Sequence, residues 1–288
     1  MAKKSAPIRL YDPAKLALVN PETMNLWKKY QIDMELRELS EKTIHGYEND
    51  LQHWWIYIYD NQGNKSILEI KEDDITEFLY WCKKQGNNSR RIKRRMSSIA
   101  AFYKFLRKKR YISENPMEFI DRPKKDTDVV EQTFLTVEQV DEMREKLTEK
   151  VEEAKTKAAK HTALTMRLYA FFSLSTMARV NAVSSIRWEQ LDWENRLADG
   201  VVEKEGYVVT LYFSQEVLGY LEELRQYRQE NGIDDGGWVF FVPGRPTDRP
   251  ISNSTLNGWC KRIGALIDVP TLHPHDFRHS GSQIMKLA

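Results

Sequence analysis

The stretch from 90 to 106 constrains the fold of this chain more than any other segment. Its apolar residues recur at intervals of 4, 3, 4 and 3, which is the spacing of one buried face of an α-helix; they are Ile92, Met96, Ile99, Tyr103 and Leu106. Six lysines and arginines lie on the remaining circumference. The pattern predicts a helix that packs on one side and presents a cationic surface on the other.

Charge is distributed unevenly along the 288 residues, although the net charge is only +2. From 83 to 125 the chain carries fifteen Lys and Arg residues against three carboxylates, so the remainder is acidic. Segregated positive charge indicates contact with phosphate, and the alternative is a solvated surface. The residues expected to contact a DNA backbone are Arg90, Arg91, Lys93, Arg94, Arg95, Lys104, Lys108, Lys124 and Lys125.

Several classes of protein do not fit the composition. No run of 18 or more apolar residues occurs and the first residues lack the apolar core of a signal peptide, so we expect a soluble, cytoplasmic protein without membrane contact. The two cysteines, Cys82 and Cys260, form no CxxC pair. We therefore expect both to be buried, with neither a disulfide framework nor a thiolate metal site.

Helical patterns through the first half predict one helical domain over 21–121, preceded by an arm over 1–20. The helix that opens at Ser40 carries an aromatic inner stripe in which Trp54 and Trp55 are expected in the core. Pro123 and its charged neighbours end the helical pattern, because proline removes a backbone donor. Residues 122–133 are predicted to be a linker.

A second domain is predicted over 134–288. Thr136 and Gln139 have capping-box spacing, 145–160 is expected to be a long exposed helix, and 162–175 a buried one. Leu197–Glu203 and Tyr207–Phe213 are predicted to pair as a β-hairpin, followed by helices over 215–230, over 254–267 and after Pro274. The predicted fold class is mostly α with a small antiparallel β-hairpin or sheet in the C-terminal half.

Two motifs 99 positions apart can hold an anion. Arg179 follows a buried apolar helix, where a permanent charge needs either a phosphate or an ion-pair partner such as Asp192 or Glu194. His275 and Arg278 lie one turn apart at a predicted helix N-terminus, which favours anions. Two arginines offer the bidentate geometry that phosphate oxygens accept.

These residues resemble the tyrosine recombinases of the phage integrase type, over about 22–287. The first half is similar to the helical, SAM-like core-binding domain in Leu39–Ile44, Arg94–Leu106 and Asn115-Pro116. The second half is similar to the catalytic domain in two boxes, Thr176–Arg179 followed by Ile186–Asp192, and His275–Ser280. In this order, behind that helical domain, the boxes are a specific signal.

The resemblance implies a two-domain, C-shaped clamp on duplex DNA at a specific site, working as a homo-oligomer in bacteria or a phage-infected host, associated with the nucleoid. Arg179 and Arg278 would hold the scissile phosphate, His275 would assist proton transfer, and Lys204 would be the general acid. The reaction would be site-specific recombination or integration of phage or mobile-element DNA. No metal or other cofactor is implied, because a phosphotyrosyl link keeps the bond energy.

The chain also departs from the family pattern. Met177 stands where a glycine is usual, Ala182 stands where an acidic residue is usual, and Glu203 and Glu205 flank the hairpin lysine. No tyrosine follows Tyr227, so the family's nucleophile is absent from its matching place and activity as an enzyme stays open.

Two interpretations account for the missing tyrosine. The chain is either a recombinase polypeptide that stops short of its nucleophile, or a recombinase-fold regulator without catalysis, such as a repressor of a phage or mobile element. A metalloprotein that uses His273, His275 and His279 is a third class, but no carboxylate or cysteine cluster completes that site. A purely structural helical protein would leave the segregation of charge unexplained.

Overall fold

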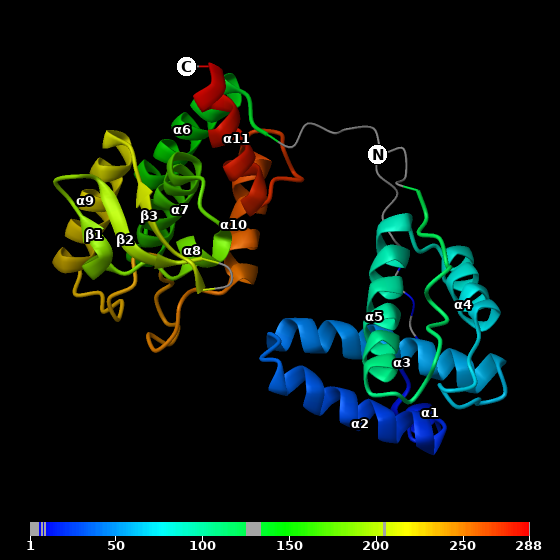
Figure 1. Ribbon diagram of the computed structural model, residues 1–288. Helices are drawn as coiled ribbons and strands as arrows, with labels where there is room; N and C mark the ends of the chain where they lie inside the picture. The colour runs from blue at the N-terminus through cyan, green and yellow to red at the C-terminus, as the bar shows by residue number, and fades with distance from the viewer. Residues whose placement is uncertain (1–5, 7, 9, 125–133, 204–205, 288) are drawn as a thin grey trace. The chain divides into compact units, whose positions relative to one another are not determined.

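The computed structural model describes residues 6, 8, 10–124, 134–203 and 206–287, which form two compact units, Met1–Glu131 and Gln132–Ala288 (Figure 1). The predicted fold class is confirmed, since the described residues are mostly helical with one small antiparallel sheet in the second half. The helices of the first unit are α1 Pro13–Leu16, α2 Pro21–Leu36, α3 Glu41–Asn61, α4 Glu72–Lys84 and α5 Ser89–Lys108.

Aromatic rings fill the core of the first unit. Trp54 and Trp55 of α3 are fully buried, which confirms their expected place. Tyr30 of α2 packs against Phe102 of α5 with ring centroids 5.3 Å apart, and Trp55 meets the same phenylalanine edge-on at 6.1 Å. Because each ring removes a large apolar area from water, these contacts fix α2, α3 and α5 against one another.

The expected arm is partly structured. Asp12 caps the short helix α1 by accepting a hydrogen bond from the Ala14 amide at 2.9 Å. Lys15 of that helix pairs with Asp60 of α3 at 2.7 Å, and Asn20 caps α2. The predicted arm over 1–20 therefore contains a short helix, which the cap from Asp12 and the ion pair of Lys15 hold in place.

The second unit packs helices against a small sheet. Its strands run antiparallel in the order β1-β2-β3, and β2 carries an irregularity between Ala198 and Val201. The two-residue strand β1 was not predicted from the sequence. The elements are α6 Val137–Glu152, α7 Lys157–Thr176, α8 Val180–Ser184, the 3-10 turn η1 Trp188–Gln190, β1 Leu191–Asp192, β2 Leu197–Val202, β3 Val208–Tyr212, α9 Gln215–Glu230, α10 Asn253–Leu266 and α11 Pro274–Leu287.

Side-chain caps set the ends of α6 and α7. The capping box of Thr136 and Gln139 is confirmed, with hydrogen bonds of 3.0 and 3.2 Å. The single helix predicted over 145–160 was wrong, because α6 ends at Glu152 and Thr156 caps α7 by accepting from the Ala159 amide at 3.1 Å. Helix-forming residues on both sides of this break conceal it from the helical pattern.

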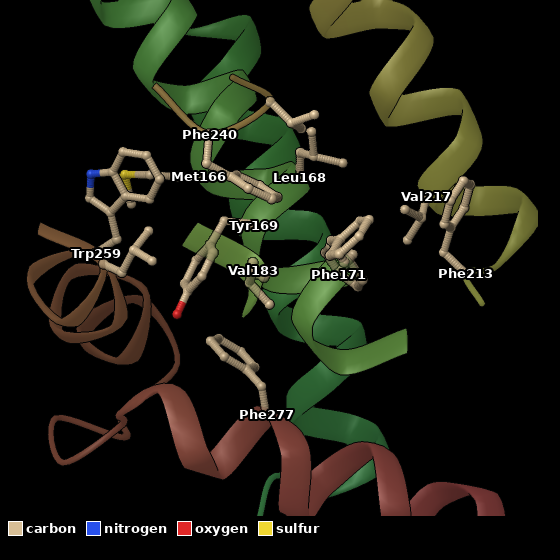
Figure 2. Close-up of a cluster of buried hydrophobic side chains, with 14 of the residues drawn as sticks. Met166, Leu168, Tyr169, Phe171, Val183, Phe213, Val217, Phe240, Trp259 and Phe277 are labelled. Atoms are coloured by element: carbon tan, nitrogen blue, oxygen red, sulfur yellow. The ribbon is translucent and has the colours of Figure 1, made fainter. Parts of the chain in front are cut away.

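Helix α7 is the central element of the second unit, and its Tyr169 contacts α10, α11 and the segment between α9 and α10 (Figure 2). The ring of Tyr169 lies 5.9 Å from Phe240, 5.8 Å from Trp259 and 6.0 Å from Phe277, all edge-on. Phe277 belongs to α11 and immediately precedes Arg278. This packing therefore anchors the second anion motif to the helix that leads to the first.

Both cysteines are buried, as expected. Burial raises the pKa of the Cys82 thiol and of the Cys260 thiol to about 11, so both are protonated at neutral pH. Within the described ranges, none of the helices has the length and apolarity that crossing a bilayer demands.

Candidate active site and nucleic-acid interface

Arg179 lies at a sharp change of chain direction between α7 and α8. Helix α7 ends at Thr176, Met177 adopts a left-handed conformation with φ 53°, and Arg179 becomes the N-cap residue of α8. Its side chain is 44% exposed, so the arginine projects from the end of the buried helix toward solvent. Left-handed backbone favours glycine, which gives a physical reason for the glycine that is usual at the place of Met177.

Arg278 reaches the same turn from α11. Its Nη1 atom donates to the backbone carbonyl of Met177 at 2.7 Å, and its side chain is 41% exposed. Gly281, one turn further along α11, allows this approach, because a Cβ there would lie 2.2 Å from the carbonyl oxygen of Leu174. The two anion motifs are thus brought together at the end of α7.

The carboxylate of Glu203, just after β2, contacts both arginines. It accepts hydrogen bonds from the Nη1 atom of Arg179 and, at 3.3 Å, from the backbone amide of Arg179. Its Oε1 atom lies 3.9 Å from the Nη1 atom of Arg278. An ion-pair partner was the alternative to phosphate for Arg179, and in the described residues that partner is Glu203; Asp192, one of the two carboxylates suggested for the role, accepts from Asn195.

His275 lies on the first turn of α11 and is exposed. It precedes Arg278 by three residues, so the two side chains share a face of the helix. The neighbouring Asp276 is occupied in capping, because it accepts from the His273 amide at 2.9 Å and lies 3.0 Å from Nδ1 of that histidine. Lys204, the expected general acid, lies outside the described residues.

A metal site would need several ligand side chains that converge on one ion. No three His, Cys, Asp or Glu side chains converge there in a way that could hold an ion. In the histidine-rich segment, the ring centroids of His273 and His275 lie 6.1 Å apart and the two rings are nearly perpendicular to each other.

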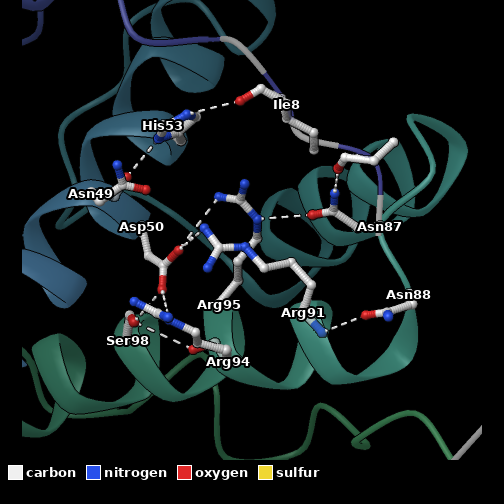
Figure 3. Close-up of polar contacts among 11 residues, drawn as sticks. Ile8, Asn49, Asp50, His53, Asn87, Asn88, Arg91, Arg94, Arg95 and Ser98 are labelled. Atoms are coloured by element: carbon white, nitrogen blue, oxygen red, sulfur yellow. Dashed lines mark hydrogen bonds and ion pairs between the residues drawn. The ribbon is translucent and has the colours of Figure 1, made fainter. Parts of the chain in front are cut away.

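A second cationic site lies on the first unit, around the buried carboxylate of Asp50 (Figure 3). Asp50 of α3 accepts from the Nη2 atom of Arg91 at 2.7 Å, from the Nε atom of Arg94 at 3.3 Å and from the hydroxyl of Ser98 at 3.0 Å. The Nη1 atom of Arg95 lies 3.9 Å away. Three guanidinium groups around one carboxylate leave an excess of positive charge at the α3–α5 surface.

Arg95 itself is buried, with only 2% of its side chain exposed. Its Nε atom donates to Asn87 at 3.1 Å, its guanidinium lies over the ring of Phe78, and burial lowers its pKa. The prediction that Arg95 lies on the exposed cationic circumference was wrong. It is adjacent to the apolar seam and its long aliphatic stem packs inward.

A pocket of about 300 Å³ adjoins this cluster between α3 and α5. Lys42 and Arg94 supply its positive charge, and the side chain of Arg94 lies close over Gly46, where a Cβ would be 2.9 Å from its Nη2 atom. The remaining lining residues are Thr43, Tyr47, Ser97 and Ser98. Lys42 was not among the residues predicted to contact DNA, since its helix lacks the dense basic pattern of α5.

The other residues expected to contact a DNA backbone have mixed exposure. Arg91 and Lys93 are half-buried, and Lys125 lies outside the described residues. Those whose side chains are exposed are Arg90, Arg94, Lys104, Lys108 and Lys124.

Comparison with known proteins places the chain in a family. Residues 28–110 match the phage integrase N-terminal SAM-like domain, and 134–286 match the phage integrase family. With a helical first unit and two arginines converging in the second, the chain belongs to the phage integrase family of tyrosine recombinases.

Its relatives within that family include two kinds of Xer protein. Tyrosine recombinase XerD of Oceanobacillus iheyensis is 32% identical over 253 residues, which cover 85% of this chain and 78% of the relative. Tyrosine recombinase XerC of Anoxybacillus flavithermus is 27% identical over 274 residues, which cover 90% of this chain and 82% of the relative.

Solved structures share the fold at lower identity. The Tn1549 transposon integrase in complex with circular intermediate DNA has a TM-score of 0.67 at 18% identity, with 91% of this chain and 87% of that one covered. The XerH site-specific recombinase bound to palindromic difH substrate also has a TM-score of 0.67, at 14% identity, with 98% and 80% covered.

Proposed function

We propose that this chain binds duplex DNA at a specific site and acts in site-specific recombination, with Arg179 and Arg278 holding the phosphate at which strands are exchanged. One observation carries the proposal: the two guanidinium groups, 99 positions apart in sequence, flank a single carboxylate at the end of α7. Both are more than two-fifths exposed, so an anion from solution can reach them.

The proposed roles of these residues follow from the negative charge that develops during phosphoryl transfer. Negative charge grows on the non-bridging oxygens as a nucleophile approaches phosphorus, and two fixed guanidinium groups stabilise it. His275, on the same face of α11 as Arg278, is placed to assist proton transfer, and Lys204 is proposed as the acid for the leaving oxygen. A phosphotyrosyl link would conserve the bond energy without a metal or nucleotide cofactor.

The α3–α5 pocket is proposed to hold a backbone phosphate away from the reacting bond. Lys42 and Arg94 would face that phosphate, and the buried Asp50 would keep the guanidinium of Arg94 in place. Such contacts position a protein on duplex DNA without reading its sequence. The remaining proposed contacts to the backbone come from Arg90, Arg91, Lys93, Lys104, Lys108, Lys124 and Lys125.

The relatives support further parts of the proposal. A solved structure of lambda integrase contains a dimer bound to a core site, and we extend this by proposing a clamp of two domains and a homo-oligomer on DNA. Because the proposed substrate is DNA, we also propose that the protein is cytoplasmic and associated with the nucleoid. The target sequence is set by side chains that reach base edges, and contacts of Arg179 and Arg278 with a phosphate do not specify it.

The binding half of the proposal is tested by salt dependence. Affinity for a fluorescein-labelled duplex, measured by anisotropy at several salt concentrations, should fall steeply, because each neutralised phosphate adds about 0.9 to the slope of log K against log salt. Affinity that does not change with salt would contradict contact with the phosphate backbone.

The covalent half is tested with DNA that carries phosphorothiolate bonds at candidate sites. Residues 279–288 contain no tyrosine, so we expect the 288-residue chain to bind such DNA without a covalent product. Any longer natural form that supplies a tyrosine should give a covalent protein–DNA adduct. Tight site-specific binding without an adduct from such a form would favour a DNA-binding regulator.

A further inference from the structure

Glu203 occupies the place between the two arginines that the proposed function assigns to a DNA phosphate. We propose that Glu203 is a built-in counter-ion that competes with phosphate for Arg179 and Arg278 and must leave before DNA engages both. The inference rests on the proposed function and adds an inhibitory contact to it. Neither arginine box contains this residue, which lies 24 positions after Arg179.

The contacts of Glu203 resemble those that a bound oxyanion would make. One carboxylate oxygen accepts a hydrogen bond from the Nη1 atom of Arg179. The other accepts from the backbone amide of Arg179 at 3.3 Å and lies 3.9 Å from the Nη1 atom of Arg278. A carboxylate thus spans donors from two separate segments of chain. The same donors suit the oxygens of a phosphodiester.

The two anions exclude each other for steric and electrostatic reasons. Only 11% of the Glu203 side chain is exposed, so it fills the space between the guanidinium groups. A phosphate that contacted both arginines with Glu203 in place would lie within a few ångströms of a second negative charge, and such like-charge contact is unfavourable. Phosphate and carboxylate must therefore exchange.

The location of Glu203 makes this exchange feasible. Val202 and Val208 form the last paired position of β2 and β3, and Glu203 follows that pair. Its one backbone tie in the described residues is the hydrogen bond from its amide to the carbonyl of Tyr207, at 2.7 Å. Both guanidinium groups stay accessible to solvent on their other sides, so an incoming anion can approach while the carboxylate swings away.

A positioning role would have the opposite consequence. The acidic residue that is usual three places after the first arginine is replaced by the buried Ala182, and Glu203 could stand in for it by orienting Arg179. In that case Glu203 would keep its bond while phosphate is bound, and its removal would weaken phosphate binding. Contact with Arg278 as well as Arg179 favours competition, because one carboxylate then covers both phosphate-binding groups.

The test is a calorimetric titration with inorganic phosphate. It compares the full wild-type chain with Glu203→Gln and with a control variant. Asp199→Asn is the control, because Asp199 lies on β2, the strand that leads to Glu203, accepts from Thr210 at 2.7 Å and loses the same charge. Glu203→Gln should bind phosphate about tenfold more tightly, equivalent to about 1.4 kcal/mol, with Asp199→Asn unchanged. An equal or weaker affinity in Glu203→Gln would overturn the proposal.

Two further measurements make the result unambiguous. Glu203→Ala should also tighten phosphate binding, which covers the case in which glutamine disturbs the local fold, and thermal unfolding of each variant reports folding. Duplex binding by Arg278→Ala is measured in parallel. If Arg278→Ala loses affinity for duplex while Glu203→Gln gains no affinity for phosphate, the competition proposal alone fails. If Arg278→Ala binds duplex as the wild type does, the proposed function fails.

Discussion

Gly281 of α11 lies against the carbonyl of Leu174 near the end of α7, so closely that a Cβ at Gly281 would lie 2.2 Å from that oxygen. The same position would bring a Cβ to 2.7 Å from the side chain of Met177. Three residues earlier, Arg278 donates to the carbonyl of Met177. The distance between α11 and α7 therefore sets where the second arginine stands relative to the first.

Gly281→Ala is expected to push α11 away from α7. The added methyl group meets backbone that cannot move independently, so the variant should lose about 1–3 kcal/mol of unfolding free energy, as overpacked interiors do. It should also weaken inorganic phosphate binding, because Arg278 moves with the helix. Chemical denaturation and calorimetry measure the two effects.

Gly219→Ala is the matched control for that substitution. Gly219 lies within α9 with nothing within 4 Å of an added Cβ. Alanine is the better helix former, so this variant should gain about 0.5–1 kcal/mol and leave phosphate binding unchanged. Equal behaviour of the two variants would show that the close contact at Gly281 does not position the site.

The buried histidine of the second unit should make stability depend on pH. His161 accepts from the Nε atom of Arg228 at 2.9 Å, and burial lowers its pKa from 6.5 to about 4. A depressed folded-state pKa means that the stabilisation is complete above pH 6.5 and is lost as pH falls through about 4. The loss should be about 3 kcal/mol, since each unit corresponds to 1.36 kcal/mol.

Denaturation of the wild type, His161→Gln and His45→Gln between pH 7 and pH 4 measures this effect. His45 is 81% exposed, so its replacement should leave the pH dependence unchanged, whereas His161→Gln should flatten it. A wild-type stability that does not change across this window would contradict a neutral, buried His161.

Replacement of Arg95 and of Arg90 should affect stability differently, although the two arginines lie only five positions apart on α5. Arg95→Ala removes a buried side chain that packs on Phe78 and bonds Asn87, and it should cost about 2–4 kcal/mol of stability. Arg90 is exposed, so Arg90→Ala should change stability by at most about 0.5 kcal/mol. Denaturation of both variants tests the assignment; similar losses would contradict it.

Lys42 should count as one phosphate contact. Lys42→Ala is expected to weaken binding to a random-sequence duplex and to reduce the salt slope by about 1, as the loss of one neutralised phosphate does. Lys15→Ala serves as control, because Asp60 already neutralises Lys15 at 2.7 Å. An unchanged slope for Lys42→Ala would remove the α3–α5 pocket from the interface.

Local signals in the sequence predicted most of the fold. The helix predicted over 215–230 matches the observed bounds of α9, and the spacing of Thr136 and Gln139 identified the start of α6. Hydrogen bonds within a few residues determine such features. Strand β1 was missed because two residues are too short to show a period, and it depends on pairing with Leu197 and Ala198.

The candidate site was predictable only in part. Arg179 and Arg278 stand in motifs and could be named, but their shared carboxylate could not, because Glu203 meets them only through the tertiary fold. Arg95 shows a second limit: a long cationic side chain beside an apolar seam gives the same pattern whether it points outward or packs inward. Gly281 carries no sequence signal, since its role lies in the close approach of another helix.

The central claim is that Arg179 and Arg278 act together on one phosphate. A double-mutant cycle in duplex binding, with Arg179→Ala, Arg278→Ala and the double variant, measures their coupling at fixed salt. Two arginines on one phosphate should give a loss in the double variant that differs from the sum of the single losses by at least about 0.5 kcal/mol. Single variants that bind duplex as the wild type does, or losses that simply add, would contradict the claim.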